Sequence, residues 1–249
     1  MREVGTTPTY GPGLGDDEAL RLQAKARLAA TQKGNERRYT QHPWPFLREC
    51  IWTVDQVRNT VRPFPGEDRD PDPRCPCAEG GCVSYQHHLV NVWLREPRLL
   101  VPKSRRMFAT WTLLACHYWL ARYRPNSFIA IVSRKRGETD AEGSAELVKR
   151  IKFMHEHLPP ECRTMAMEYQ FARIRFPEVN TEIVGIGQGA DQLRQYTATA
   201  ILFDEFAFWE QAQPTYGASF PTLEGGGRLT IISSANPGFF KQLVHDEQA

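Results

Sequence analysis

The sequence lacks a long apolar run and an apolar leader. Residues 1–15 are rich in glycine, proline and threonine, and no apolar stretch approaches the roughly 18 residues that a membrane-spanning helix needs. We therefore expect a soluble, intracellular protein. In that environment the six cysteines are expected to be reduced thiols and not disulfides.

The sequence also lacks an excess of one charge. Lysine and arginine number 31 against 29 acidic residues, so the net charge of +2 does not indicate a partner. The distribution says more, because cations gather in the middle third, where they either suit the phosphate backbone of DNA or merely form a solvated surface. These cations are Arg105, Arg106, Arg122, Arg124, Arg134, Lys135, Arg136, Lys149, Arg150 and Lys152.

Apolar segments typical of buried strands alternate with helical patterns along the 249 residues. The strand segments are residues 99–101, 128–133, 172–176, 181–186, 201–203 and 229–233. This alternation predicts an α/β fold with a mostly parallel central sheet and a ligand at the carboxyl ends of the strands. Residues 172–176 and 181–186 flank a short turn and are expected to form an antiparallel hairpin.

Three helices are expected outside this strand pattern. One begins near Asp16 after an N-terminal arm, which places the arm and its helix in residues 1–40. A second covers residues 45–61, where apolar residues recur at helical spacing. A third opens with a capping box of Thr139 and Glu142 and carries an apolar stripe that ends at Leu158.

Two adjacent carboxylates follow the apolar strand at residues 201–203. An aspartate at this position, Asp204, can hold Mg²⁺ through water, and the next residue, Glu205, can direct a water toward a γ-phosphate. An ordinary strand followed by a solvated acidic turn is the alternative.

A basic turn follows the strand at residues 99–101 and leads into a helix. Lys103 and the arginines after it could reach phosphates that bind at the N-terminus of that helix, or the turn could simply be solvated. The turn has Phe108 and Ala109 where the general P-loop has Gly-Lys. Without glycine the loop is not expected to use positive φ freely, so a degenerate site with weak or no nucleotide binding stays open.

These segments, together with the small polar residues after the strand at 229–233, resemble the ATPase domain of large terminase subunits, the motors that package DNA into the heads of tailed phages. The resemblance covers residues 45–240 and implies a P-loop NTPase fold, a three-layer sandwich. It implies that Lys103 is the phosphate lysine of a deviant Walker A loop and Arg106 the loop arginine. That loop comprises Lys103, Ser104, Arg105, Arg106, Met107, Phe108, Ala109 and Thr110.

The same resemblance implies roles for the other segments. Thr110 and Asp204 would ligate Mg²⁺, and Glu205 would be the catalytic glutamate. A coupling motif would consist of Ser233, Ser234, Ala235 and Asn236. Arg194 stands where the family has an arginine before the Walker B strand, and contact with phosphate or a structural salt bridge are both open.

Three further segments allow two interpretations each. Phe64 could contact adenine or pack in the core. Ser133 and Arg134 could touch DNA or a neighbouring subunit, or lie on a solvated surface. The insertion at residues 66–86 could bind zinc, but its cysteine spacing fits no usual zinc site, so a surface loop of thiols is preferred. The possible zinc ligands are Cys75, Cys77, Cys82 and His87.

The resemblance predicts an ATP-hydrolysing motor in residues 41–249 that moves double-stranded DNA. Its expected partners are a portal protein, a small terminase subunit and further copies of itself in a ring, in the host cytoplasm and outside the mature virion. No C-terminal nuclease domain and no DNA cleavage are expected. One alternative is a superfamily 2 helicase fragment, although the usual Gly-Lys-Thr and a second motor domain are missing. Another is a P-loop module that binds DNA or proteins without hydrolysis.

Overall fold

The computed structural model describes residues 34–55, 60–65, 84–134, 141–223 and 225–245. The chain divides into two compact units, residues 1–41 and 42–249. Residues 34–41 of the first unit are helical. The helix expected from Asp16 and the cysteines at 75, 77 and 82 lie outside the described residues. The second unit contains the sheet.

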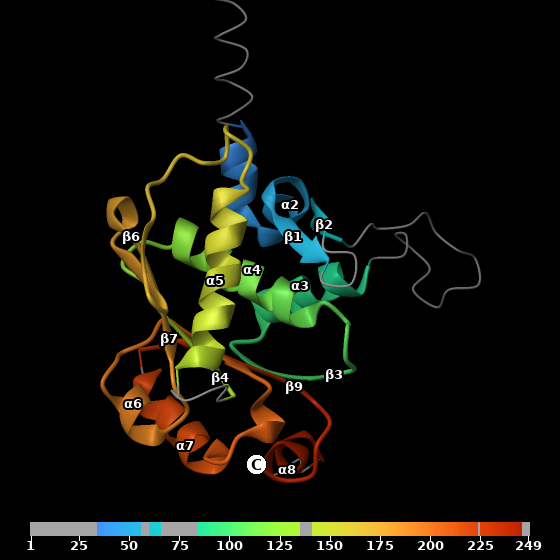
Figure 1. Cartoon of the computed structure of the whole chain (residues 1–249), viewed down its shortest axis with the longest axis vertical. Coiled ribbons are helices and arrows are strands. Elements are labelled where there is room, and N and C mark those ends of the chain that lie inside the picture. The colour runs from blue at the N-terminus through green and yellow to red at the C-terminus, as the bar shows by residue number, and fades with distance from the viewer. Residues whose placement is uncertain (1–33, 56–59, 66–83, 135–140, 224, 246–249) are drawn as a thin grey trace, which may run out of the picture. The chain divides into compact units, whose positions relative to one another are not determined.

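The second unit is built on a seven-stranded sheet with the strand order β3-β9-β8-β4-β7-β6-β5. The strands are β3 (Arg98–Lys103), β4 (Phe128–Ser133), β5 (Glu168–Gln170), β6 (Arg173–Phe176), β7 (Thr181–Ile186), β8 (Ala200–Asp204) and β9 (Arg228–Ser234). The first five strands of the order are parallel, while β6 and β5 continue the sheet in antiparallel fashion. Figure 1 labels β3, β9, β4 and β7 of this sheet. The mostly parallel sheet and the predicted hairpin of β6 and β7 are confirmed.

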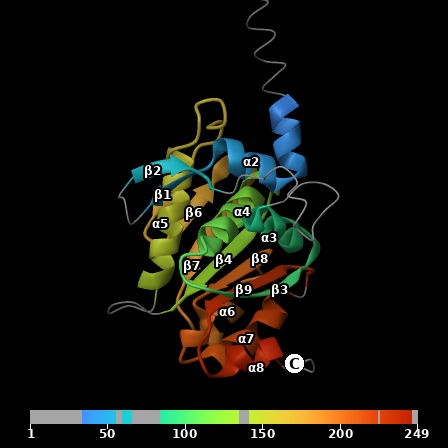
Figure 2. The same cartoon turned by 90° about the vertical axis from the view of Figure 1, so that its right-hand side faces the viewer.

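Helices cover both faces of this sheet, which confirms the predicted three-layer sandwich (Figure 2). One face carries α4 (Ala109–Tyr123) and α5 (Glu142–Glu156), with α2 (Pro43–Cys50) and α3 (Tyr85–Arg95) packed against α4. The other carries α6 (Ala190–Arg194), α7 (Ala212–Thr222) and α8 (Phe239–His245). The remaining elements are the 3-10 turns η1 (Pro177–Val179) and η2 (Phe206–Phe208) and the hairpin of β1 (Trp52–Asp55) and β2 (Thr60–Pro63). None of the helices in these described segments has the length and apolar character of a membrane span.

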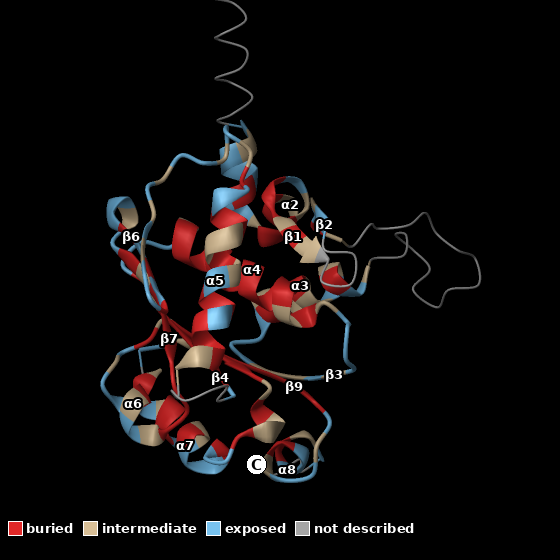
Figure 3. Ribbon diagram, in the orientation of Figure 1, coloured by how far each residue is buried: buried red, intermediate tan, exposed pale blue. Residues whose placement is uncertain are grey.

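Helix α4 is the most deeply buried helix on its face of the sheet (Figure 3). Every residue from Trp111 to Arg122 is buried. A helix that is enclosed around its whole circumference is fixed by packing on all sides. The loop that precedes α4 therefore joins a rigid helix to a strand of the central sheet.

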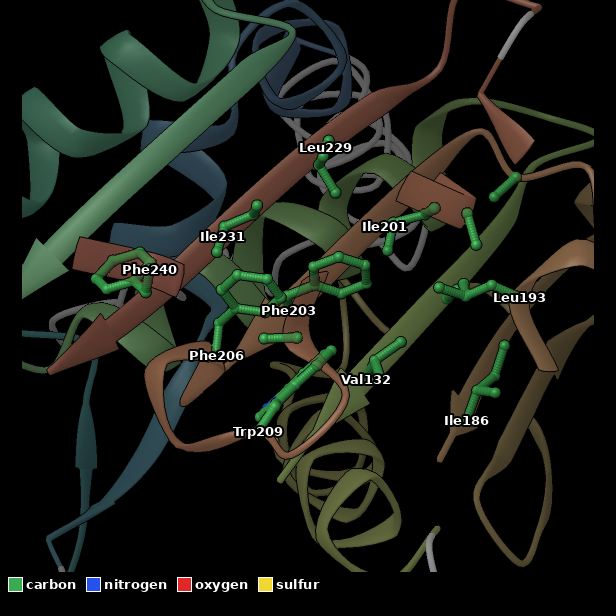
Figure 4. Packing of buried hydrophobic residues seen from close by; sticks show 14 of the residues in the cluster. Val132, Ile186, Leu193, Ile201, Phe203, Phe206, Trp209, Leu229, Ile231 and Phe240 are labelled. Carbon is green, nitrogen blue, oxygen red and sulfur yellow. The ribbon is translucent and has the colours of Figure 1, made fainter. Parts of the chain in front are cut away.

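An aromatic cluster supports the carboxyl end of β8 from the other face (Figure 4). The ring of Phe203 lies 5.5 Å from that of Phe206 and 4.9 Å from that of Trp209, measured between centroids. The indole Nε1 of Trp209 donates a hydrogen bond of 3.0 Å to the main-chain oxygen of Asp204. The residues that follow β8 are thus held by the hydrophobic core.

The helix predicted over residues 45–61 is wrong in its second half. Helix α2 ends at Cys50, and residues from Trp52 onward form β1. The backbone of Ile51 is extended, with φ −87° and ψ 133°. The apolar spacing continues past this point, but the Trp-Thr-Val segment favours a strand once it can pair with β2.

Candidate active site

Three parallel strands end side by side and bring the predicted site residues together. Strand β9 lies between β3 and β8. In the register of these strands Lys103 lies opposite Ser234, and Asp204 lies opposite Ile232. The carboxyl ends of parallel strands are where α/β folds bind ligands, so the shared edge is the candidate site.

Both carboxylate oxygens of Glu205 have protein partners. Lys103 Nζ donates to Oε1 at 3.0 Å, and Ser234 Oγ donates to Oε2 at 3.2 Å. The Lys103 side chain is 11% exposed and that of Glu205 is 24% exposed, so this ion pair is partly shielded from water. Glu205 has a φ of 53°, an unusual conformation for a residue with a side chain, which directs its carboxylate toward these two donors.

Asp204 is buried beside the first turn of α4. Its Oδ1 accepts a hydrogen bond of 3.1 Å from Thr110 Oγ1. Burial raises the pKa of Asp204, while the charge of Lys103 opposes that rise. The adjacent hydroxyl and carboxylate oxygens fit Mg²⁺, which takes one or two protein oxygens and completes its shell with water and phosphate.

The loop before α4, residues 104–108, adopts positive φ without glycine. Arg106 has a φ of 64° and Phe108 a φ of 59°. The expectation that this loop would avoid positive φ is therefore wrong. Contacts on both sides support the conformation: Tyr85 Oη donates to the Met107 carbonyl at 2.6 Å, and the Phe108 carbonyl accepts from Thr112 N and Oγ1, each at 3.1 Å.

A cavity of about 420 Å³ opens at this edge of the sheet. Its lining consists of Lys103, Arg105, Arg106, Arg134, Glu205, Phe208 and Ser234. Four of these side chains are cationic, and within the described part of the chain only Lys103 among them forms an ion pair. The cavity therefore offers an excess of positive charge to an anion.

Arg134 is the lining residue that the sequence interpretation assigned elsewhere. It follows β4, which lies beside β8, and its guanidinium carbon is 5.7 Å from the centre of the Phe208 ring. Ser144 Oγ accepts from Ser133 N at 2.9 Å, which ties the end of β4 to α5. Gly143 permits this approach, because a Cβ there would lie 2.1 Å from the Arg134 carbonyl oxygen. The sequence signal that could have placed Arg134 in the site is its position directly after a predicted parallel strand.

The small polar residues after β9 hold the segment that follows Glu205. Ser233 Oγ accepts from Ala207 N, and Asn236 Nδ2 donates to the Ala207 carbonyl, each at 3.0 Å. Ser234 contacts the Glu205 carboxylate itself, whereas Ala235 lines a separate cavity beside α8. Three of the four predicted coupling residues thus contact residues 205–207.

Phe64 and Arg194 lie outside the cavity. Phe64 is 2% exposed, and its ring packs 6.2 Å from Trp44 and 5.9 Å from Phe108. Phe64 thus packs in the core, one of its two expected interpretations, and supports the loop, while a contact with adenine stays a prediction. Arg194 is exposed on α6 and pairs with Asp191 at 3.4 Å.

Among the described residues, the middle-third cations do not form one continuous exposed face. Arg122 is buried, and two lysines on α5 pair with neighbouring carboxylates, Lys149 with Glu146 and Lys152 with Glu156, each at 2.5 Å. Lys135 and Arg136 lie outside the described residues. Arg105, Arg106 and Arg134 face the cavity instead.

The zinc prediction falls mainly outside the described residues, because Cys75, Cys77 and Cys82 are not among them. His87 is described, and its ring stacks on Trp44 with centroids 4.4 Å apart. Within the described segments no group of three or more His, Cys, Asp or Glu side chains is arranged to hold a metal ion.

The mostly parallel sheet between two helical layers has the three-layer P-loop NTPase fold. The sequence matches no protein-family model and no curated protein. The structure is similar to the large terminase of bacteriophage HK97, with a TM-score of 0.53 and 13% identity over 78% of this chain and 37% of that chain. The chain thus shares the fold of a large terminase ATPase domain.

Two other solved structures have lower TM-scores. A mutant of the large terminase ATPase domain of a Thermus phage has a TM-score of 0.45 and 16% identity over 63% of this chain and 67% of that chain. The large terminase of a thermophilic bacteriophage, solved with ATP-γ-S, has a TM-score of 0.44 and 13% identity over 64% of this chain and 41% of that chain. The chain spans less than half of the solved chains of the HK97 large terminase and of the large terminase with ATP-γ-S.

Proposed function

We propose that this chain is an ATP-hydrolysing motor domain of the terminase type, which drives double-stranded DNA into a viral prohead. The observation that carries the proposal is the Glu205 carboxylate, held between Lys103 and Ser234 at a cavity lined with cations. This arrangement combines a candidate base for water with a binding surface for a polyphosphate.

The cationic side chains would bind the phosphates. Lys103, Arg105 and Arg106 approach from the loop, and Arg134 approaches from the end of β4. The N-terminus of α4 adds the partial positive charge of the helix and its main-chain N–H groups. The loop residues Ser104, Met107, Phe108 and Ala109 would contribute through their backbone.

Thr110 and Asp204 are the residues that would hold Mg²⁺. The ion, when bound with ATP, would neutralise developing charge on the phosphates. Burial raises the pKa of Asp204, so a nearby cation would favour its carboxylate form.

Glu205 would orient the attacking water and accept its proton. In the structure the carboxylate is neutralised by Lys103. When the γ-phosphate attracts the Lys103 ammonium, the Glu205 carboxylate would be released from this ion pair and could hold the attacking water. Binding of ATP would thereby activate the base that hydrolyses it.

Ser234 would link Glu205 to the rest of the coupling motif, because its hydroxyl donates to the Glu205 carboxylate. Ser233 and Asn236 of the same motif hold Ala207. Movement of residues 205–207 would then be transmitted to the DNA.

Arg194 would act on a phosphate of its own or a neighbouring subunit after leaving Asp191. Such an exposed pair contributes only about 0–1 kcal/mol, so its opening is easy.

A motor of this type would work on double-stranded DNA in a ring of identical subunits. It would meet a portal protein and a small terminase subunit in the host cytoplasm. These partners follow from the proposed function and not from any contact of this chain.

Phosphate release from Mg-ATP tests the proposal, measured with and without linear double-stranded DNA. We expect turnover by the chain that DNA increases, and no turnover above background by the Glu205→Gln variant. Equal phosphate release by the two proteins would contradict the assignment of Glu205. Absence of ATP binding by the chain would favour the non-hydrolysing module.

A further inference from the structure

Two cysteines that are 112 residues apart in the sequence meet at the far end of α4. The sulfur atoms of Cys50 and Cys162 are 2.8 Å apart. This distance exceeds the covalent S–S bond by less than about 1 Å and is shorter than an ordinary contact between sulfur atoms. Cys50 ends α2, while Cys162 lies in a turn after α5, where its N–H donates to the Pro159 carbonyl at 2.9 Å.

A buried arginine lies beside this thiol pair. Arg122 Nη2 donates to the Cys162 carbonyl and to Thr164 Oγ1, and its guanidinium also lies 5.8 Å from the centre of the Phe46 ring. No carboxylate of the described residues lies within ion-pair distance of Arg122. A buried cation without a carboxylate counter-ion favours a thiolate nearby.

The two sulfurs differ in their access to solvent. Cys50 is 1% exposed, whereas Cys162 is half-buried. The hydrogen bond with Cys50 lowers the pKa of Cys162 and the charge of Arg122 adds to this effect, while burial and the charges of Glu161 and Glu49 oppose it. Cys116 on α4 provides the contrast, because complete burial raises the pKa of its thiol. Reactive cysteines are partly exposed and lie near a positive charge, and Cys162 is half-buried and lies beside Arg122.

The geometry points to a redox modification site in which Cys162 is the attacking thiol and Cys50 the resolving thiol. A peroxide is the class of oxidant that it would take. This inference does not depend on the proposed ATPase activity, because the pair lies at the opposite end of α4 from Thr110.

The chemistry balances in two steps. The Cys162 thiolate attacks one oxygen of hydrogen peroxide, the O–O bond breaks, and a sulfenic acid and water result after proton transfer. The Cys50 sulfur then attacks the Cys162 sulfur, the S–O bond breaks, and the second water leaves. Two thiols are oxidised and one peroxide is reduced to two waters. The new disulfide would join α2 to the turn after α5.

Peptide mapping of the full chain tests this proposal. A background with Cys75→Ser, Cys77→Ser and Cys82→Ser removes the other reactive candidates. The folded protein is treated with hydrogen peroxide, and the remaining thiols are then alkylated in denaturant. We expect a peptide that links Cys50 to Cys162, complete alkylation of Cys116, and recovery of both thiols with dithiothreitol.

A matched pair of variants separates the two roles. In the same background, Cys50→Ala should leave a sulfenic acid at Cys162 that dimedone traps, whereas Cys116→Ala should still form the linked peptide. The background protein with the three serine substitutions should melt at a higher temperature after oxidation, and dithiothreitol should reverse the shift. Full alkylation of both Cys50 and Cys162 after peroxide treatment, in protein that is folded by circular dichroism, would overturn the proposal.

Discussion

The acidic and basic halves of the candidate site differ in how completely their charges are satisfied. On the acidic half, Asp204 is buried against Thr110, and both carboxylate oxygens of Glu205 accept hydrogen bonds. On the basic half, Arg105, Arg106 and Arg134 face the cavity and form no ion pair with any described residue. The acidic half is therefore built in advance, while the basic half carries charge that a ligand can neutralise.

The backbone of the two halves differs in what supports it. The segment after β8, in which Glu205 has positive φ, is held by the aromatic cluster and by Ser233 and Asn236. The loop before α4 has positive φ at Arg106 and Phe108 and is supported by hydrogen bonds from Tyr85 and Thr112. Such conformations cost on the order of 1 kcal/mol or more each, and they concentrate where backbone must approach a ligand.

Glu205→Gln should have the largest effect and should separate the two halves. Turnover of ATP should fall by roughly 10²–10⁴-fold, because the proton acceptor is lost. Affinity for ATP should be equal or higher, since glutamine no longer competes with phosphate for Lys103. Phosphate release measures turnover and calorimetry measures ATP affinity. A parallel loss of both would contradict the separation of the site into an acidic half for turnover and a basic half for binding.

Ser234→Ala should weaken the acidic half with less effect. Loss of a hydrogen bond to a charged group, worth about 1.5–3 kcal/mol, should lower turnover about ten- to a hundredfold. Ser234→Thr should restore part of the activity. Ser219→Ala is the matched control, because Ser219 is buried in α7 and its hydroxyl donates to the nearby Tyr216 carbonyl, away from Glu205. Equal losses for Ser234→Ala and Ser219→Ala would indicate a general effect on folding.

Arg134→Ala should weaken the basic half selectively for ATP over ADP. One charge-assisted contact to the terminal phosphate corresponds to about a tenfold change in affinity. Arg134→Lys should keep part of this affinity. Arg173→Ala is the matched control, because it removes the same charge from the exposed side of β6, far along the sheet. Calorimetric titrations decide the point, and an unchanged ATP affinity in Arg134→Ala would remove this residue from the site.

Asp204→Asn should raise thermal stability while it abolishes turnover. A raised pKa means that folding disfavours the carboxylate form, so the contribution of Asp204 to stability is greatest below its ordinary pKa and is lost as pH rises. In metal-free buffer at pH 7 the variant should melt a few degrees higher. The gain should shrink toward pH 4. A lower melting temperature at pH 7 would show that the carboxylate is better stabilised than its burial implies.

The strand ends were predictable from local sequence, because apolar runs ending in Lys103, Asp204 and Ser234 mark a shared sheet edge. Their contacts required the strand order, which the sequence does not reveal. Arg134 belongs to the cavity only because β4 lies beside β8. Phe64 is buried because Trp44 and Phe108 cover it, and neither contact follows from local periodicity. The end of α2 at Cys50 likewise depends on the pairing of β1 with β2.

Calorimetric titration of ATP into the wild-type chain and into Lys103→Ala tests the central claim most directly. We predict saturable binding of one ATP per chain, weakened at least about tenfold in the variant, since Lys103 is the cation that joins the two halves of the site. Equal affinity in the two proteins, or no binding by the wild type at high protein concentration, would contradict the account.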